Sequence, residues 1–429
     1  MIVLFVVSGC SKSQNVADIV GESNYHLATK QVAFQKSSEK IELESNRSVS
    51  VTNSSQLAKL DGLMFTCTLT QRNQLQIDMQ DYFRELGIDP AMIRETEPEV
   101  GKVFYSLSTP ESETETLSLK KQKKYFIHDE VIALPNINGK FQYVKTVSRK
   151  EILLSLLQHG RLTEFRGNAC SISALRDHVG VRQNIVAWAE KLNWQWPNGD
   201  SAFWNNKFWN KGTPLPSVSL DKALLDAFIN QKQYGIGCFT ATKLSYAQGI
   251  LDYFVRIKKD SVKAALVRER LLQDQDPLVG VAPPSMWSFE RDFDPSELNM
   301  PGKILSIKRG IAIGNFVPGD WIYLLNTDAM SYEKPGYEGS NAIYLGRGIF
   351  DDYYNDNNHH YTYKEKLDEV YQWRNGVFSR SRDFKKIKPL NVEDYYRLSK
   401  SPNAGGLLED FRVSPYLFGY EELPKLLIH

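Results

Sequence analysis

The stretch YGIGCFTATKLSYAQGILDYF, residues 234–254, places one cysteine between glycines and a run of apolar residues. Leu244, Ala247 and Leu251 recur in that run at the spacing of a helix face. The spacing predicts a helix that begins near Cys238, because the glycines before it favour a tight turn into the helix.

Cys238 has two interpretations. A thiol at a helix N-terminus lies near backbone N–H groups and the positive end of the helix dipole, and both favour the reactive thiolate. The N–H groups around Gly237 and Phe239 are placed to hold an oxyanion, and Gly237 leaves room for an acyl group. The other interpretation is a small buried residue of the core, which is the commoner role of a lone cysteine.

The elements around this segment change character along the chain. Residues 151–260 have the apolar period of helices, whereas residues 302–313, 319–326 and 340–348 alternate like strands. A run of helices followed by a run of strands predicts an α+β fold.

Three sequence blocks, in order, carry a resemblance to a known family. They are RQNIVAWAEKL (182–192), GIGCFTAT (235–242) and the pair PGDWIYLLN (318–326) with YEGSNAIYLGRG (337–348). Together they resemble the spore-type Tgl family of protein-glutamine gamma-glutamyltransferases, within the wider NlpC/P60 papain-like group. The resemblance implies a papain-like domain with helices preceding an antiparallel sheet. It also implies acyl transfer from a glutamine side chain to an amine, with Cys238 as the nucleophile.

The chain departs from this family at three positions that carry ionisable side chains in the family. The family's glutamate before its cysteine is replaced by Gly237. The family's glutamate before its Asn-x-Ile-x-Leu-Gly strand falls at Ser340, with Glu338 two residues earlier. An ungapped count from Ser340 places the family's histidine at Tyr353, which is a poor base at neutral pH. Ser340 or Asn341 is then expected to polarise the imidazole of another histidine.

The imidazole that a reactive thiol needs is expected among seven histidines. Only His359 and His360 follow the strands where a papain-like partner would lie. His360 is favoured because it heads HYTYKE (360–365), which is expected to be a strand, and His359 is the alternate. Asp351, Asp352 or Glu338 is expected to orient the imidazole. The competing interpretation of this histidine pair is a solvated loop.

The N-terminal stretch MIVLFVVSGC resembles the lipobox of a bacterial lipoprotein, in which Cys10 is lipidated. Residues 1–10 would be the signal and residues 11–55 a polar tether. Ser11 fits retention in an outer membrane, so the expected location is the cell envelope, lipid-anchored and facing the periplasm. No basic residue precedes the apolar run, and a buried first strand is the alternative.

Three further units are expected along the chain. Residues 56–150 read as a mixed α/β domain, with a strand pair across the turn at Asn138 and Gly139. Residues 151–385 would be the catalytic domain. Residues 386–429 would be a tail that packs across it.

The remaining cysteines and the charge exclude several classes of protein. Cys67, Cys170 and Cys238 are an odd number, so at least one thiol stays unpaired, and Cys170 is interpreted as structural. No spacing typical of a zinc site occurs, and neither a metal nor a cofactor is expected. A net charge of +1 gives no field that would attract nucleic acid.

The tryptophan-rich stretch at 194–210 fits no helix face. The favoured interpretation is a loop whose indoles are fixed in the core. The alternative makes it a wall of the substrate cleft, and the cleft candidates are Trp204, Trp209, Asn341 and Tyr353.

Three functions follow, of which the first is preferred and the third ranks slightly ahead of the second. The first is a transglutaminase or glutamine deamidase that acts on a glutamine-bearing protein or peptide, with an amine as the second substrate. The second is a papain-like amide hydrolase that uses water. The third is a binding lipoprotein that keeps the fold without the catalysis.

Overall fold

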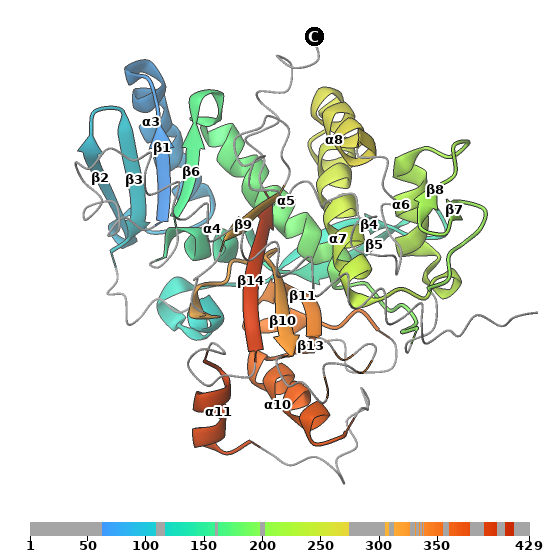
Figure 1. Cartoon of the computed structure of the whole chain (residues 1–429). Helices are drawn as coiled ribbons and strands as arrows, with labels where there is room; N and C mark the ends of the chain where they lie inside the picture. Colours follow the sequence, from blue (N-terminus) through green and yellow to red (C-terminus); the bar gives the residue numbers. More distant parts are fainter. Residues whose placement is uncertain are drawn as a thin grey trace, which may run out of the picture.

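The computed structural model describes residues 62–108, 116–158, 162–197, 202–273, 305–308, 313–326, 331, 334, 337, 339–354, 360–377, 390–400 and 408–415. Cys10, the expected tether at 11–55, Glu338 and His359 lie outside these residues. One continuous core of buried side chains joins an N-terminal sheet, a group of helices and one face of a second sheet. Figure 1 shows where these elements lie. Within the described part, no helix has the length and apolarity needed to cross a bilayer.

The N-terminal sheet has the strand order β2-β3-β1-β6. Its strands are β1 (Gly62–Thr66), β2 (Ile93–Glu99), β3 (Lys102–Leu107) and β6 (Leu162–Arg166). β1 is antiparallel to β3 and parallel to β6. Since β6 comes after residue 150, the boundary expected there cuts through a sheet and does not separate two folded units.

Among the described elements, two helices and a β-ribbon lie between β1 and β6 in the sequence. α3 (Leu69–Glu85) begins at a capping box formed by Thr68 and Gln71, and α4 (Arg149–Leu157) begins at Ser148. β4 (Glu130–Pro135) and β5 (Phe141–Thr146) form the antiparallel ribbon that the sequence predicted, with Gly139 at a positive φ of 68° in the turn.

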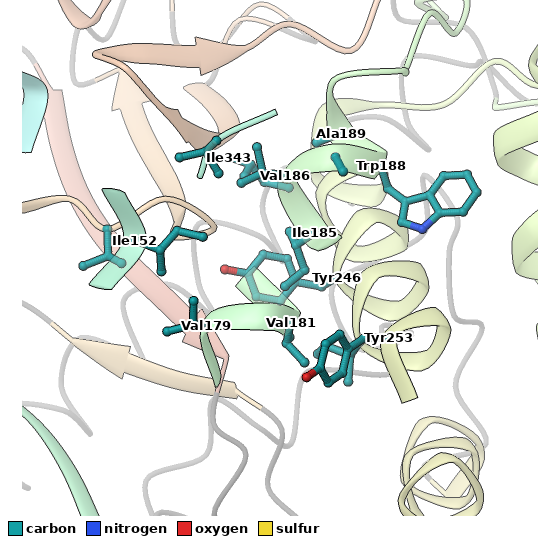
Figure 2. Close-up of a cluster of buried hydrophobic side chains, with 14 of the residues drawn as sticks. Ile152, Val179, Val181, Ile185, Val186, Trp188, Ala189, Tyr246, Tyr253 and Ile343 are labelled. Atoms are coloured by element: carbon teal, nitrogen blue, oxygen red, sulfur yellow. The ribbon is translucent and has the colours of Figure 1, made fainter. Parts of the chain in front are cut away.

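The central helices are α5 (Ile172–Ala189), α6 (Leu220–Ile229), α7 (Cys238–Asp252) and α8 (Ser261–Gln273). α7 continues into one π-helical turn, Tyr253–Ile257. α5 and α7 pack so closely at Gly249 that a Cβ atom on this residue would collide with Ile185. Figure 2 shows the apolar side chains at this contact, including Val181, Ile185 and Tyr246.

Short elements complete the chain. They are the 3₁₀ turns Pro90–Met92, Thr116–Lys121, Lys123–Tyr125, Gly167–Ala169, Gln231–Gln233 and Ile313–Asn315, and the paired strands β7 (Trp209–Asn210) and β8 (Thr213–Pro214).

The second sheet has the order β13-β12-β11-β10-β14-β9, and its neighbouring strands are antiparallel. Its strands are β9 (Leu305–Lys308), β10 (Trp321–Asn326), β11 (Gly339–Gly346), β12 (Ile349–Asp351), β13 (His360–Tyr361) and β14 (Leu408–Pro415). The α+β class with an antiparallel sheet, predicted from the sequence, is therefore observed.

Each face of this sheet has its own core. Ile343 and Leu345 of β11 pack with α5 and α7, whereas Ala342 and Tyr344 pack with Leu367 on α10 (Tyr363–Arg374). α11 (Val392–Leu398) lies beside α10. This alternation decides which side chains of β11 can reach the start of α7.

Two expectations about the C-terminal half need correction. The segment HYTYKE is a strand only at His360–Tyr361, and a capping box of Thr362 with Glu365 starts α10 directly afterwards. The tail expected at 386–429 contributes β14, which lies between β10 and β9 inside the sheet. Residues 408–415 of the expected tail are thus a strand within the second sheet and do not lie over it.

Candidate active site

Cys238 is the first residue of α7, and Gly237 is its N-cap. The first backbone hydrogen bond of the helix runs from the Ala241 N–H to the Gly237 carbonyl. The N–H groups of Cys238 and Phe239 precede this bond and point out of the helix N-terminus. The predicted start of the helix is confirmed, and the thiol is half-buried at the positive end of the dipole.

Cys238 is the one free cysteine of the described residues. Cys67 and Cys170 form a disulfide with Cα atoms 5.5 Å apart, which joins the end of β1 to the start of α5. The structural interpretation of Cys170 is confirmed, and the thiol left over by the odd count is the one at the helix N-terminus.

The side chain of Asn341 faces the thiol from β11. Its Nδ2 donates to Cys238 Sγ over 3.7 Å. Its Oδ1 accepts a hydrogen bond of 2.9 Å from the indole of Trp321, which fixes the amide with its N–H₂ end toward the sulfur. A donor held in this way stabilises negative charge on the sulfur. The phenyl ring of Phe239 packs edge-on against the same indole.

Ser340 lies on the opposite face of β11. Its neighbour Ala342 belongs to the core under α10, and Ser340 itself hydrogen-bonds with Tyr361, which is also in that core. The structure therefore brings Asn341, and not Ser340, to Cys238. One position along a strand reverses the direction of a side chain.

Tyr353 is buried beside the first turn of α7. Its hydroxyl lies 2.7 Å from Thr242 Oγ1, and the Thr242 hydroxyl donates to the Cys238 carbonyl over 2.9 Å. Because one hydroxyl carries one proton, the Tyr353 O–H must be the donor to Thr242. Burial raises the pKa of Tyr353 well above its usual range, so this phenol is neutral at physiological pH. Its backbone carbonyl accepts from the N–H of Trp194.

His360 and Asp351 are direct partners in the register of β12 and β13. Phe350 and Tyr361, the next pair, belong to the core under α10. Strand alternation therefore places His360 and Asp351 on the other face, which is the face that carries Asn341. The helix-facing side of the sheet thus carries the amide of Asn341, the imidazole of His360 and the carboxyl of Asp351, and of these groups the amide is the one in hydrogen-bond contact with the Cys238 thiol.

Asp351 is 1% exposed, and its carboxylate oxygens have no hydrogen-bond partner among the described residues. Burial, and then the neighbouring carboxyls of Asp352 and Glu190, raise the pKa of Asp351 well above its usual range. Burial of this carboxyl thus favours its protonated form over a wider pH range than that of an exposed aspartate.

The tryptophan-rich stretch is fixed mainly to the core. Trp194 and Trp209 are almost completely buried, and the Trp194 indole donates to the Ala227 carbonyl over 2.8 Å. Trp204 is half-buried and its ring lies 5.2 Å from that of Trp209. Trp209 is buried and offers no surface to a substrate, so the favoured interpretation of an indole fixed in the core describes it. Trp196 and Trp204 are only partly buried.

A buried ion pair joins two of the sequence blocks, and its role was missed in the sequence. The guanidinium of Arg182 on α5 donates to Asp320 over 2.9 Å, to the Pro318 carbonyl over 3.1 Å and to His178 Nε2 over 2.9 Å. Tyr246 of α7 donates to the neighbouring Gly319 carbonyl. The sequence signals for this ion pair were an arginine in an apolar helix and the Pro-Gly-Asp turn before β10. The contacts of Arg182 and Tyr246 with this turn fix β10, and with it Trp321, against the helices.

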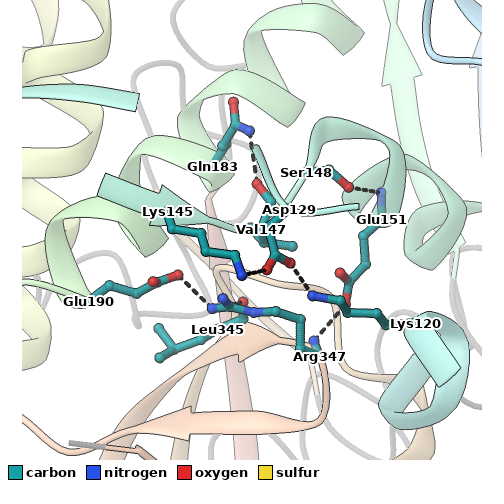
Figure 3. A network of polar contacts seen from close by, with 10 residues as sticks. All are labelled: Lys120, Asp129, Lys145, Val147, Ser148, Glu151, Gln183, Glu190, Leu345 and Arg347. Atoms are coloured by element: carbon teal, nitrogen blue, oxygen red, sulfur yellow. Dashed lines mark hydrogen bonds and ion pairs between the residues drawn. The ribbon is translucent and has the colours of Figure 1, made fainter. Parts of the chain in front are cut away.

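A polar network holds the turn between β11 and β12 (Figure 3). Arg347 donates through its side chain to Glu190 and through its backbone N–H to Glu151, each over 2.6 Å. Burial is the main cause that raises the pKa of Glu151 to about 7 and that of Glu190 to about 6. Within the described residues, no three His, Cys, Asp or Glu side chains are grouped as metal ligands would be.

Comparison with known proteins identifies the class to which this site belongs. The family model described as protein-glutamine gamma-glutamyltransferase matches residues 136–376, which is more than half of the chain. The chain belongs to this family, as the resemblance of the three sequence blocks had indicated. The matched range contains Arg182, Cys238 and Asn341.

Individual relatives are distant. The protein-glutamine gamma-glutamyltransferase of Bacillus mycoides (strain KBAB4) is 24% identical over 218 residues, which cover 49% of this chain and 67% of the relative. The protein-glutamine gamma-glutamyltransferase of Bacillus cereus (strain AH820) is 23% identical over 218 residues, which cover the same 49% of this chain and 67% of the relative. Among solved structures, the transglutaminase from Geobacillus stearothermophilus without its C-terminal extension is similar to 59% of this chain and 97% of its own, at 18% identity and a TM-score of 0.36.

Proposed function

We propose that this chain is a cysteine-dependent acyltransferase that acts on protein glutamine through a thioester at Cys238. One observation carries the proposal. In a member of a protein-glutamine gamma-glutamyltransferase family, the only free thiol of the described residues lies at a helix N-terminus, with the Asn341 amide donating to it. A thiol in that setting is the activated nucleophile that acyl transfer requires.

The proposed reaction has two steps, formation of a thioester at Cys238 and transfer of its acyl group to an amine or to water. The Cys238 thiolate attacks the carboxamide carbon of a glutamine side chain, the C–N bond breaks, and ammonia leaves with the proton taken from the thiol. An amine then attacks the thioester and restores the thiol. Attack by water in place of the amine yields glutamate. The N–H groups of Cys238 and Phe239 stand where the oxyanion of each tetrahedral intermediate would form, and Gly237 leaves space for the acyl group.

His360 is the proposed proton carrier between the thiol and the leaving ammonia. Support comes from the sheet register, which places His360 on the face of Asn341 and opposite Asp351. Asp351 would orient the imidazole or exchange a proton with it. A cysteine at the start of a helix that packs on an antiparallel sheet, with an imidazole and a carboxyl on the next strands, supports the proposal of a papain-like site. Glu338 and His359 remain candidates outside the described residues.

Two features favour the competing proposal of a binding protein without catalysis. Tyr353 lies at the position where an ungapped count places the family's histidine, and its hydroxyl donates its proton to Thr242. Ser340 replaces the family's glutamate and faces the other core. An amide hydrolase on the same site is the third possibility, distinguished only by whether water or an amine accepts the acyl group.

Amine incorporation by the full chain tests the proposal. A fluorescent amine is supplied with a glutamine-bearing protein, and both the label and released ammonia are followed. Cys238→Ala is expected to abolish both while thermal unfolding is unchanged. His360→Ala is expected to lower the rate by about a hundredfold or more, and His128→Ala, an exposed histidine of another region, is the matched control.

Each result assigns one function. Full incorporation by Cys238→Ala would overturn the thioester. Ammonia release without label by the natural chain would establish the hydrolase. Absence of both, with glutamine-bearing protein still bound, would establish the non-catalytic alternative.

We also propose a lipid anchor at Cys10 and an envelope location. The lipobox-type sequence motivates it, and the Cys67–Cys170 disulfide is a bond that an oxidising compartment permits. Cys10→Ala is expected to move the protein from the membrane fraction to the soluble fraction of cells. Retention of the variant in the membrane fraction would contradict the anchor.

A further inference from the structure

Asp226 on α6 is a buried acid that accepts hydrogen bonds from three side chains. It is 3% exposed. Its Oδ2 accepts from the Tyr234 hydroxyl over 2.6 Å and from Nδ2 of Asn205 over 2.7 Å, and its Oδ1 accepts from the amide of Asn230. The two donors to Oδ2 belong to different segments of the chain, the residues that lead to Cys238 and the tryptophan-rich stretch. One oxygen atom therefore joins these two segments.

Tyr234 begins the approach segment, residues 234–237, which ends at the thiol. Its side chain is completely buried, and its ring meets the Trp204 indole edge-on at a centroid distance of 5.9 Å. Burial, and then the hydrogen bond to Asp226, raise the pKa of Tyr234 well above its usual range, so the phenol keeps its proton and remains the donor. Only residues 235–237 separate Tyr234 from Cys238. A displacement of Tyr234 would therefore reach the start of α7 over a very short length of backbone.

The tryptophan-rich stretch holds the backbone of the approach segment from two sides. Gly235 exchanges two hydrogen bonds of 3.0 Å with the backbone of Phe203, and the Ile236 N–H donates to the Gln195 carbonyl over 3.2 Å. The ring of Phe203 lies so close to Gly235 that a Cβ atom there would collide with it. The position of the approach segment thus depends on the position of the tryptophan-rich stretch.

Asn205 attaches that stretch to α6 next to this contact. It lies two residues after Phe203, and its backbone carbonyl accepts the N–H groups of two residues in the turn that follows. Its side chain donates to Asp226. Asp226 therefore holds both partners of the pair Phe203–Gly235, through Asn205 on one side and through Tyr234 on the other.

The start of α7 is what this arrangement fixes. Gly237 is the N-cap of α7, and the N–H groups of Cys238 and Phe239 follow it. These groups favour the thiolate, and can hold an oxyanion, only while the helix terminus keeps its orientation toward the sulfur and the acyl group. We propose that Asp226 is a positioning residue of the active site, which holds the approach segment and the tryptophan-rich stretch together so that α7 begins in the orientation that the thiol requires.

The effect of Asp226 on acyl transfer rests on the proposed function, whereas its effect on the thiol does not. Alkylation of Cys238 by iodoacetamide in the full chain, followed by mass spectrometry from pH 6 to pH 10, measures the second effect alone. Tyr234→Phe removes one donor to Oδ2 and keeps the ring, and Asn205→Ala removes the other. Each is expected to slow alkylation at pH 7 by about threefold or more, the range that a helix terminus contributes to a charge, and to leave the limiting rate at high pH unchanged. The midpoint of the pH profile would thus move to a higher pH, which a loss of stability alone does not produce.

Asn230→Ala is the matched control. It removes the third donor to the same acid, but Asn230 is the C-cap of the helix that carries Asp226 and joins neither segment. Its midpoint of thermal unfolding should fall as that of Tyr234→Phe does, while its alkylation profile should equal that of the natural chain. Asp226→Ala should shift the profile further than either variant of a single donor. If Asp226→Ala does not fold, the variants at Tyr234, Asn205 and Asn230 decide the question.

Amine incorporation measures the effect on the proposed reaction. Tyr234→Phe should lower kcat by about tenfold or more and leave the KM for the glutamine-bearing protein unchanged, because the oxyanion exists only in the transition state and in the intermediate beside it. Asn230→Ala should incorporate the amine as the natural chain does.

The outcomes separate the two proposals. A shifted alkylation profile in Tyr234→Phe and Asn205→Ala, but not in Asn230→Ala, supports the positioning role even if the natural chain incorporates no amine, a result that would remove the acyltransferase alone. Unchanged profiles and an unchanged kcat in Tyr234→Phe and Asn205→Ala would overturn the positioning role while the acyltransferase stands. Equal shifts in all three variants would show that Asp226 acts only through the stability of α6, which would also overturn the proposal.

Discussion

Asn341 and Cys238 meet across the interface of β11 and α7, with Nδ2 of the amide 3.7 Å from the sulfur. The Trp321 indole holds the other end of the amide, so the donor and not the carbonyl oxygen faces the thiol. Asn341→Leu is expected to slow alkylation of Cys238 by iodoacetamide at neutral pH about tenfold, since removing a hydrogen bond to a charged group costs about 1.5–3 kcal/mol. The rate constant of labelling measures it.

Ser340→Ala is the control for that prediction, because Ser340 is the preceding residue on the same strand and points to the opposite core. Its labelling rate should equal that of the natural chain. If Ser340→Ala slows labelling and Asn341→Leu does not, then Ser340 and not Asn341 faces the thiol, and β11 lies one residue out of this register.

Tyr353→Phe removes the donor to Thr242 without changing the ring. The free energy of unfolding should fall by about 0.5–1.5 kcal/mol, while amine incorporation is retained, because the neutral phenol directs its proton away from the sulfur. Denaturant unfolding and the incorporation rate check the two parts. A large loss of activity at unchanged stability would instead give Tyr353 a part in proton transfer.

Arg182→Met should be strongly destabilising. It leaves Asp320 buried and unpaired with this guanidinium, and breaking one partner of a buried pair costs about 3–5 kcal/mol. Arg268→Met breaks a half-exposed pair with Asp221 and should cost under about 1 kcal/mol. Adding Asp320→Asn to Arg182→Met should recover part of the loss. Equal unfolding midpoints for Arg182→Met and Arg268→Met would refute the structural role of the buried pair.

The raised pKa of Glu151 predicts that the stability of the protein depends on pH. Its pKa is raised by burial to about 7, so the native state binds a proton that the unfolded state has released. The stability from this group is present below about pH 4.5 and is lost as the pH rises through about 7. Glu151→Gln mimics the protonated acid and does not titrate. The free energy of unfolding of the variant minus that of the natural chain should therefore increase by up to about 3 kcal/mol from pH 5 to pH 8.

Glu99→Gln changes an exposed acid of β2 and should follow the natural chain across the same pH range. The comparison is made by urea unfolding at several pH values. A constant difference between Glu151→Gln and the natural chain would mean that Glu151 is ionised in the folded protein throughout.

Local patterns were sufficient to predict α7, its start at Cys238 and the strands β10 and β11. Glycines before an apolar helical period and two-residue alternation are properties of neighbouring residues, which a sequence displays directly. The choice between Ser340 and Asn341 was beyond these patterns, because alternation assigns the two residues to opposite faces without saying which face meets the helix.

Pairings between distant segments were also beyond local patterns. Asp351 faces His360 only because β12 and β13 pair in one register, and Arg182 finds Asp320 across 138 positions. The tail was misplaced for the same reason. Leu408–Pro415 has the composition of an ordinary strand, and nothing adjacent to it in sequence indicates that its partners are β9 and β10.

The position of β14 has a consequence for the order in which the protein matures. Among the described strands it is the last to leave the ribosome, yet it separates β9 from β10 in the finished sheet. The backbone of β10, whose Trp321 aligns the amide at the thiol, therefore lacks one neighbour until residue 408 has been made. A nascent or truncated chain ending before that point exposes an unpaired edge of β10, so the strand that carries Trp321 gains its second neighbour only once β14 has been made.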